Sequence, residues 1–141
     1  MANNLDYNDA LKNAMLDTID GQVGAAGKLQ IFAHTATPTI DAADAGTKVA
    51  DITMGATMMA AAAAGAISKA GDTWSDTSAD ATGTANYFRV KTSAAGTGAS
   101  TTIMQGTVGL SAGTFDLELD NTSITAGQTV TVSAFTITGG N

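Results

Sequence analysis

The fold is decided where the sequence reads Lys28-Leu29-Gln30-Ile31-Phe32-Ala33-His34. Upstream of this stretch the apolar residues recur at a helical spacing, whereas within it they alternate along the chain. A change of period from about 3.6 to 2 marks the passage from a helix to strands. We therefore expect an N-terminal helical arm over residues 1–24 and a β domain over residues 25–141.

The helical pattern runs from Asn4 to Asp20. Asn3 or Asn4 is expected to cap its first turn, and Gly21 is expected to end it in a left-handed conformation. Its apolar residues form one stripe along the helix, in which successive members lie one turn apart. The members of this stripe are Tyr7, Leu11, Met15 and Ile19.

The opposite face of this helix is polar and is expected to face solvent. It consists of Asn8, Asp9, Lys12, Asn13, Asp17 and Asp20. The apolar stripe must cover another surface, because a helix of this length gains most of its stability from packing. That surface belongs either to the chain's own domain or to a neighbouring subunit.

Further segments alternate or carry β-branched residues, and turn residues separate them. Their number and spacing predict a mainly β protein, an antiparallel β-sandwich preceded by one short helix. Jelly-roll and immunoglobulin-like topologies both remain open. These strand segments are 48–52, 84–92, 102–108, 115–120 and 128–138.

Two segments need separate comment. Between Gln128 and Thr138 the alternation changes phase near residues 133–134, which indicates a bulge or a strand that passes from one sheet to another. Residues 55–66 contain five consecutive alanines and two methionines, a composition that favours a helix. Glycines at both ends leave little length for one, so we expect extended structure there.

The charge balance excludes some partners. Six Lys and Arg against thirteen Asp and Glu give a net charge of −7, which phosphate backbones repel, so no nucleic-acid binding is expected. The chain has no cysteine and therefore no disulfide or thiolate chemistry. The N-terminus lacks a secretory pattern and the longest apolar run is alanine-rich, so a soluble protein without a membrane segment is expected.

No arrangement of residues predicts an enzyme. His34 is the only histidine, no Gly-x-Ser-x-Gly turn occurs, and Gly24–Lys28 departs from the spacing of a phosphate-binding loop. The acidic residues of 115–120 alternate with leucine and phenylalanine as on the wet face of a sheet, rather than as a catalytic pair. No catalytic residue and no cofactor is predicted.

The acidic loops could in principle bind calcium, which needs only oxygen ligands. Asp72, Asp76 and Asp80 are evenly spaced but lack the order and the distal glutamate of an EF-hand loop. A solvated loop is the default interpretation, and we assign no metal ligand. Calcium binding there remains an open alternative.

The composition favours a structural assembly protein. Apolar residues make up 44% of the chain, but many of them are alanine, so contacts with neighbours would add to the stability of a modest core. Aromatic side chains are favoured interface anchors, and Trp74 and Tyr87 are expected to be exposed. Together with Tyr7, Leu11, Met15 and Ile19 of the helix, they are the predicted interface residues.

Several stretches resemble a family of small virion proteins of tailed bacteriophages. They are GAAGKLQIF at residues 24–32, DTSADATGTANYFRV at 76–90, QGTVG at 105–109 and LDNTSITAGQTVTV at 119–132. The resemblance extends over scattered parts of most of the chain and implies a component of the virus particle. It does not distinguish the capsid surface from the neck or the tail.

Size and composition favour the capsid surface. The chain is one small domain without a coiled coil or fibre repeat, and many copies bridging shell subunits would make weak individual contacts sufficient. We therefore expect a cement or decoration protein on a bacteriophage head, whose partners are the major capsid protein and further copies of itself. The alternative is a tail or neck structural protein, with host-receptor binding as one role.

Overall fold

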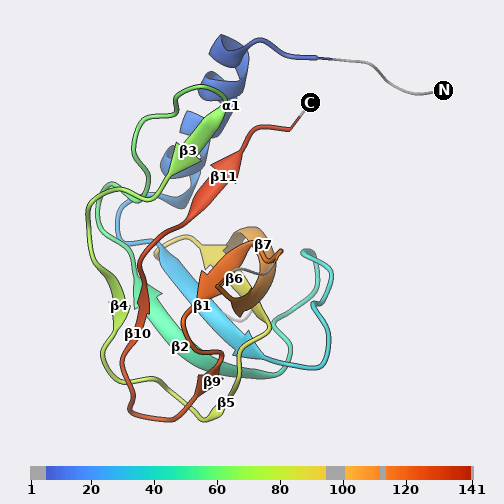
Figure 1. Ribbon diagram of the computed structural model, residues 1–141, viewed down its shortest axis with the longest axis vertical. Helices are drawn as coiled ribbons and strands as arrows, with labels where there is room; N and C mark the ends of the chain where they lie inside the picture. The colour runs from blue at the N-terminus through green and yellow to red at the C-terminus, as the bar shows by residue number, and fades with distance from the viewer. Residues whose placement is uncertain (1–5, 95–100, 112–113, 141) are drawn as a thin grey trace, which may run out of the picture.

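A computed structural model describes residues 6–94, 101–111 and 114–140 (Figure 1). The protein is mainly β, with one helix at its N-terminal end, as the sequence predicts. The elements are α1 Asp9–Val23, β1 Lys28–Ala33, β2 Thr47–Thr53, β3 Ala66–Ser68, β4 Trp74–Asp76, β5 Gly83–Thr84, β6 Tyr87–Lys91, β7 Thr102–Leu110, β8 Leu117–Leu119, β9 Ser123–Ile124, β10 Val130–Val132 and β11 Thr136–Thr138.

Helix α1 begins and ends later than predicted. Its N-cap is Asn8, not Asn3 or Asn4, and the Asn8 side chain accepts a hydrogen bond from the Leu11 N–H at 2.9 Å. At the other end Gly24 has a φ of 72° and its N–H donates to the Asp20 carbonyl oxygen. Gly24, rather than Gly21, therefore ends the helix, because only glycine adopts this backbone without strain.

The largest sheet has five strands in the order β2-β1-β6-β7-β8. Its first four strands are antiparallel neighbours, as predicted, but β8 runs parallel to β7. The predicted alternation of residues 115–120 is confirmed only over 117–119, where Leu117 and Leu119 are buried while Glu118 is exposed; Phe115 precedes the strand and is exposed. The sheet is strongly curled in a β-sandwich-like arrangement, with short strand pairs packed around it (Figure 1).

The phase change in the last predicted strand is a passage between two strand pairs. Val130–Val132 pairs with β4, whereas Thr136–Thr138 pairs with β3, which confirms the second of the two predicted explanations. The alanine-rich segment 55–65 forms no helix and leads in an irregular, extended path to β3. The prediction against a helix is therefore confirmed, although the segment is a loop and not a strand.

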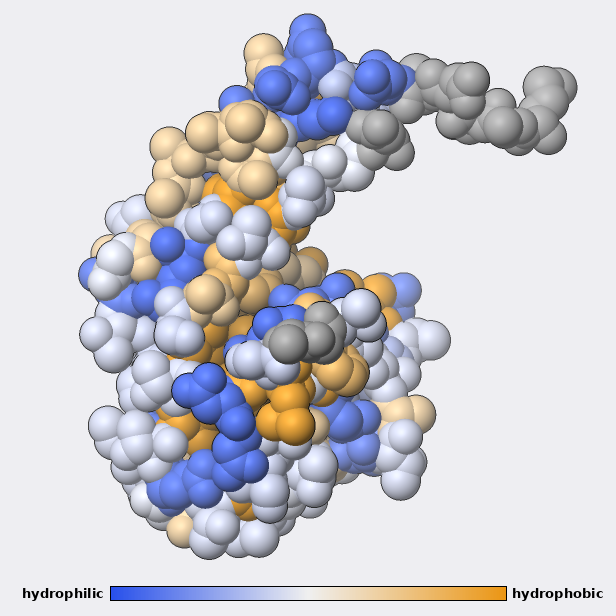
Figure 2. Space-filling model, in the orientation of Figure 1, coloured by the Kyte–Doolittle hydropathy of each residue, from blue (hydrophilic) through white to orange (hydrophobic). Residues whose placement is uncertain are grey.

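One continuous core joins the helix to the sheet. Leu16 and Val23 of α1 belong to the same buried cluster as residues from β1, β2 and β6. We call α1 together with β3 and β11 the helix–ribbon unit; it extends from one end of the curled sheet (Figure 1). Figure 2 shows a recess between this unit and the sheet, with hydrophobic side chains along its inner wall.

Candidate protein interface

The predicted apolar stripe of α1 is largely uncovered in this chain. Leu11 is 46% exposed and Met15 is 54% exposed, although both are large apolar side chains. Tyr7 is partly exposed, whereas Ile19 is partly buried and packs against the core. The stripe is thus divided along its length: its last member joins the chain's own core, while Leu11 and Met15 face outward.

Trp74 is not on the surface, contrary to the expectation that it is exposed. Its side chain is fully buried beside Phe135, with ring centroids 5.9 Å apart, and the Lys69 ammonium lies 5.4 Å from its ring centre. The prediction failed because Trp74 begins a short strand that β10 covers from a distant part of the sequence. As a buried core residue, Trp74 is removed from the candidate interface.

Tyr87 is also fully buried, which corrects the second aromatic prediction. Its ring stacks on Phe32 at a centroid distance of 4.9 Å, and its hydroxyl bonds to both the N–H and the carbonyl oxygen of Ala45. Burial raises the pKa of the Tyr87 phenol, although the hydrogen bond to Ala45 and the charge of Arg89 act in the opposite direction. Tyr87 therefore anchors the loop 34–46 of its own chain, which connects β1 to β2.

The same loop, residues 34–46, also covers two charged residues of β6. The Arg89 guanidinium is fully buried and donates to the carbonyl oxygens of Ala42 and Thr39 at 2.8 and 3.0 Å. Asp44 accepts from Arg89 at 3.0 Å and from the equally buried Lys91 ammonium at 2.6 Å. The loop is thus held by charged groups excluded from water, and its role in this chain is structural.

The polar face of α1 also turns inward, contrary to the sequence expectation. Asp20 Oδ1 accepts hydrogen bonds from the backbone N–H groups of Met58 and Met59 at 2.8 and 3.1 Å. Two further side chains repeat this pattern one and two turns earlier along the helix. Asp17 Oδ1 binds the Ala62 N–H at 2.8 Å, and Asn13 Oδ1 binds the Gly65 N–H at 2.9 Å.

These bonds explain why Leu11 and Met15 face solvent, although other apolar residues of the same helix are buried. The loop 58–65 is built mainly from alanine, so its backbone N–H groups need acceptors from elsewhere. The carboxylates and the amide of α1 supply them, and this fixes the rotation of the helix. Leu11 and Met15 are consequently left outside the core, and Met15 borders the recess.

The recess consists of two adjoining hollows that meet at Thr138 of β11. The larger, of about 510 Å³, lies between β11 and the main sheet and is lined by Phe88, Met104 and Phe115 among others. The smaller, of about 240 Å³, lies between α1 and the end of β11 and includes Met15 and Ile19. Phe115 is 45% exposed, so large apolar side chains border the recess on both sides.

The other residues considered for chemistry are dispersed. Asp76 accepts from the Asp51 and Ser78 N–H groups, Asp80 pairs with Lys48 at 3.1 Å, and Asp72 stands apart from both. Among the described residues no group of three or more His, Cys, Asp or Glu side chains could hold a metal ion. His34 is exposed at the end of β1, where its backbone N–H donates to Asn86.

The site of greatest interest is therefore a surface and not a catalytic centre. It combines the exposed part of the α1 stripe with the recess beside β11. Within residues 6–94, 101–111 and 114–140, no helix has both the length and the apolar character needed to cross a bilayer. Comparison of the chain with protein-family models, curated proteins and solved structures gives no match.

Proposed function

We propose that this chain is a structural component of a bacteriophage particle, and specifically a cement or decoration protein that binds across subunits of the head shell. The proposal combines the resemblance of four sequence stretches to small virion proteins with the character of the candidate interface. It assigns the chain a role in attachment without a chemical reaction.

The observation that carries the proposal is the exposure of Leu11 and Met15 on a helix whose polar face is already occupied. An ordinary surface helix buries its apolar side and hydrates its polar side. Here Asp17 and Asp20 bind the chain's own backbone, and the first part of the apolar stripe is exposed, although the rest of the helix packs against the core. An uncovered apolar helix face of this kind suits contact with another protein.

Attachment to a shell also suits the scale of this surface. Two half-exposed apolar side chains, one of which borders a recess, offer a small contact, which would be weak on its own. On a shell, each decorating unit meets several identical subunits at a high local concentration, so weak contacts accumulate. The negative net charge of −7 requires that the complementary shell surface not be strongly acidic.

The test is attachment of purified protein to heads that lack it. A Leu11→Asp and Met15→Asp double variant should keep its fold and lose attachment, because each change places a charge in the apolar contact. Ala10→Asp is the matched control: Ala10 is exposed on the same helix, about 100° around from Leu11 and about 140° from Met15, and should leave attachment intact.

Retained attachment of the double variant would contradict the proposal, and so would its unfolding, because the stripe would then be an internal surface. Copy number in purified particles separates the locations. A cement protein should be present in numbers comparable to the major shell protein, whereas a neck or tail component should be present in only a few copies.

A further inference from the structure

Among the residues that the structure describes, no strand pairs with one of the two edges of β11. On its other edge, the Lys69 N–H donates to the Phe135 carbonyl oxygen at 2.8 Å and the Gly139 N–H donates to that of Gly65 at 2.7 Å. Ile137 pairs with Ile67 between these two bonds. Because the backbone groups of a strand alternate in direction, those of Thr136 and Thr138 point away from β3.

Within the described residues, this outward edge belongs to a sheet of only two strands, β11 and β3. Exposed edges are usually protected by a charged residue, a proline or a bulge. The sequence from 135 to 140, Phe-Thr-Ile-Thr-Gly-Gly, contains no charge and no proline, and the pairing with β3 is regular. The recess beside this edge leaves room for an added strand.

We propose that a second copy of this chain pairs its own β11 with this edge, antiparallel, about a two-fold axis that passes between the two Ile137 residues. In this register Thr136 of each copy lies opposite Thr138 of the other. Both residues direct their N–H and C=O groups to the shared edge, so four backbone hydrogen bonds form. The two-stranded ribbons then become one four-stranded sheet.

The strand sequence fits this symmetry. A two-fold interface requires that the same surface be complementary to itself. The residues on either side of Ile137, whose backbone groups point to the shared edge, are both threonine. Threonine pairs are favourable across antiparallel strands. The two Ile137 residues form the central non-hydrogen-bonded pair, in which Cα atoms approach to about 4.5 Å.

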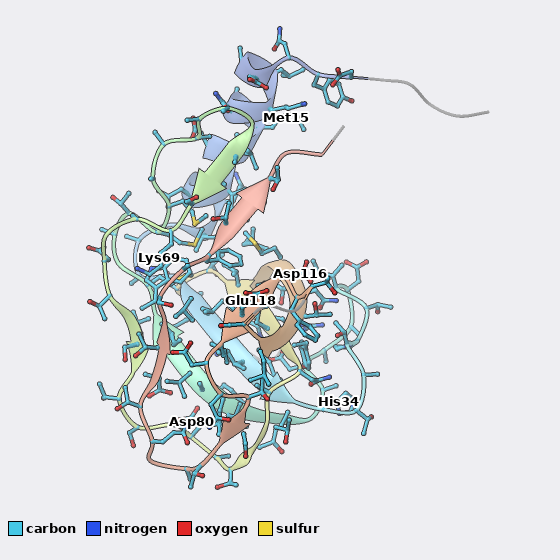
Figure 3. All side chains as sticks on the ribbon, in the orientation of Figure 1. Met15, His34, Lys69, Asp80, Asp116 and Glu118 are labelled. Atoms are coloured by element: carbon cyan, nitrogen blue, oxygen red, sulfur yellow. The ribbon has the colours of Figure 1, made fainter. Side chains whose placement is uncertain are left out.

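The charges around the recess also favour a second copy as the occupant. Lys12 borders the recess where β11 ends, and Asp116 borders the larger hollow. Figure 3 places Asp116 at the opposite end of β11 from Met15, which shares the smaller hollow with Lys12. Because the two-fold axis exchanges the ends of the strand, Lys12 of each copy is carried toward Asp116 of the other.

The surface buried in the proposed dimer is small, which bears on its expected affinity. Three residue pairs with their flanking side chains bury on the order of 500 Å² per copy, less than the ~800 Å² of a standard interface. We therefore expect a weak dimer in solution. The inference rests on the strand edge and does not require that the protein attach to a shell.

Disulfide trapping tests the register, and the chain's lack of cysteine makes each engineered thiol unambiguous. The Ile137→Cys variant should cross-link to itself under mild oxidation, because the paired Cα atoms lie within disulfide range. Thr136→Cys and Thr138→Cys should each cross-link poorly alone and efficiently when mixed. Equal cross-linking of all three single variants would overturn the proposal.

Sedimentation velocity tests the hydrogen bonds at the edge. Thr138→Pro removes an N–H that faces away from β3 and should weaken dimerisation at least tenfold while the ribbon stays paired. Thr138→Val keeps this N–H and is the matched control, which gives up only the threonine pairing and should weaken dimerisation much less than the proline variant. A wild-type chain that remains monomeric at about 1 mM would overturn the proposal.

Discussion

Strand β6 of the five-stranded sheet buries charged residues, whereas helix α1 of the helix–ribbon unit exposes apolar ones. In the sheet, all five residues of β6 are buried, including Arg89 and Lys91, because a loop of the same chain covers them. In the helix–ribbon unit, apolar Leu11 and Met15 are exposed, and no described strand pairs with the outer edge of β11. The difference indicates that the sheet supplies stability, whereas the helix–ribbon unit is available for association.

The largest expected effect comes from breaking the buried charge cluster of the sheet. Asp44→Ala leaves the Arg89 guanidinium and the Lys91 ammonium without their shared carboxylate in a site closed to water. Removing one member of such a group costs about 3–5 kcal/mol. Urea unfolding should show this loss in the free energy of unfolding.

Asp41→Ala is the matched control for that variant. Asp41 lies in the same loop but is exposed, so its removal should change the free energy of unfolding by no more than about 0.5 kcal/mol. Equal effects of the two variants would mean that the loop does not depend on the buried cluster. The buried charge cluster would then not be a source of the sheet's stability, and the contrast with the helix–ribbon unit would fail.

A second prediction contrasts two neighbouring residues of α1. Leu16 is only 6% exposed and belongs to the core, whereas Met15 is 54% exposed. Leu16→Ala should lower the free energy of unfolding by about 2–5 kcal/mol, the usual cost of deleting a buried leucine side chain. Met15→Ala should change it by about 0.5 kcal/mol or less.

Thermal and urea unfolding of these two variants measure how much each side chain contributes to the stability of the folded monomer. A large loss on Met15→Ala would show that the stripe is needed inside the folded monomer. A small loss on Leu16→Ala would show that α1 contributes little to the core. Either result would remove the distinction between the two faces of the helix on which the proposed function depends.

The strands could be predicted because alternation is a local property of the sequence. Residues 28–34 and 115–120 show it clearly, and the phase change near residues 133–134 correctly indicated a chain that passes between strand pairs. The parallel direction of β8 against β7 could not be predicted in this way. Alternation fixes the face that a side chain occupies, but carries no information on the strand's neighbour.

The candidate interface could be predicted only in part. Leu11 and Met15 were found from their spacing, but Trp74 and Tyr87 were misplaced because distant segments cover them. The inward rotation of the helix was missed for a similar reason, since it depends on the backbone of loop 58–65. A usable signal existed: an alanine-rich loop without polar side chains needs outside acceptors for its N–H groups.

The smallest expected effect concerns a half-exposed charge cluster on β1 and β2, which contrasts with the buried one on β6. Burial alone would raise the pKa of Asp51, but hydrogen bonds from Lys48 and Gln30 and the charges of Lys48 and Lys28 outweigh it and hold the pKa below 3.8. Lys48 lies 2.6 Å from Asp51 and 3.1 Å from Asp80. Because these groups are partly exposed, solvent screens the pair and its contribution to stability is modest.

The sign of the pH dependence follows from this lowered pKa. A carboxyl group with a lower pKa in the folded state contributes stability above its unfolded value, near 3.8, and loses it as the pH falls through the folded value. The free energy of unfolding should therefore fall less between pH 6 and about pH 3 in Asp51→Asn than in the unmodified chain. Asp41→Asn controls for general loss of charge and should follow the unmodified chain; identical acid profiles for all three proteins would show that the Asp51 cluster adds nothing to the stability of the sheet.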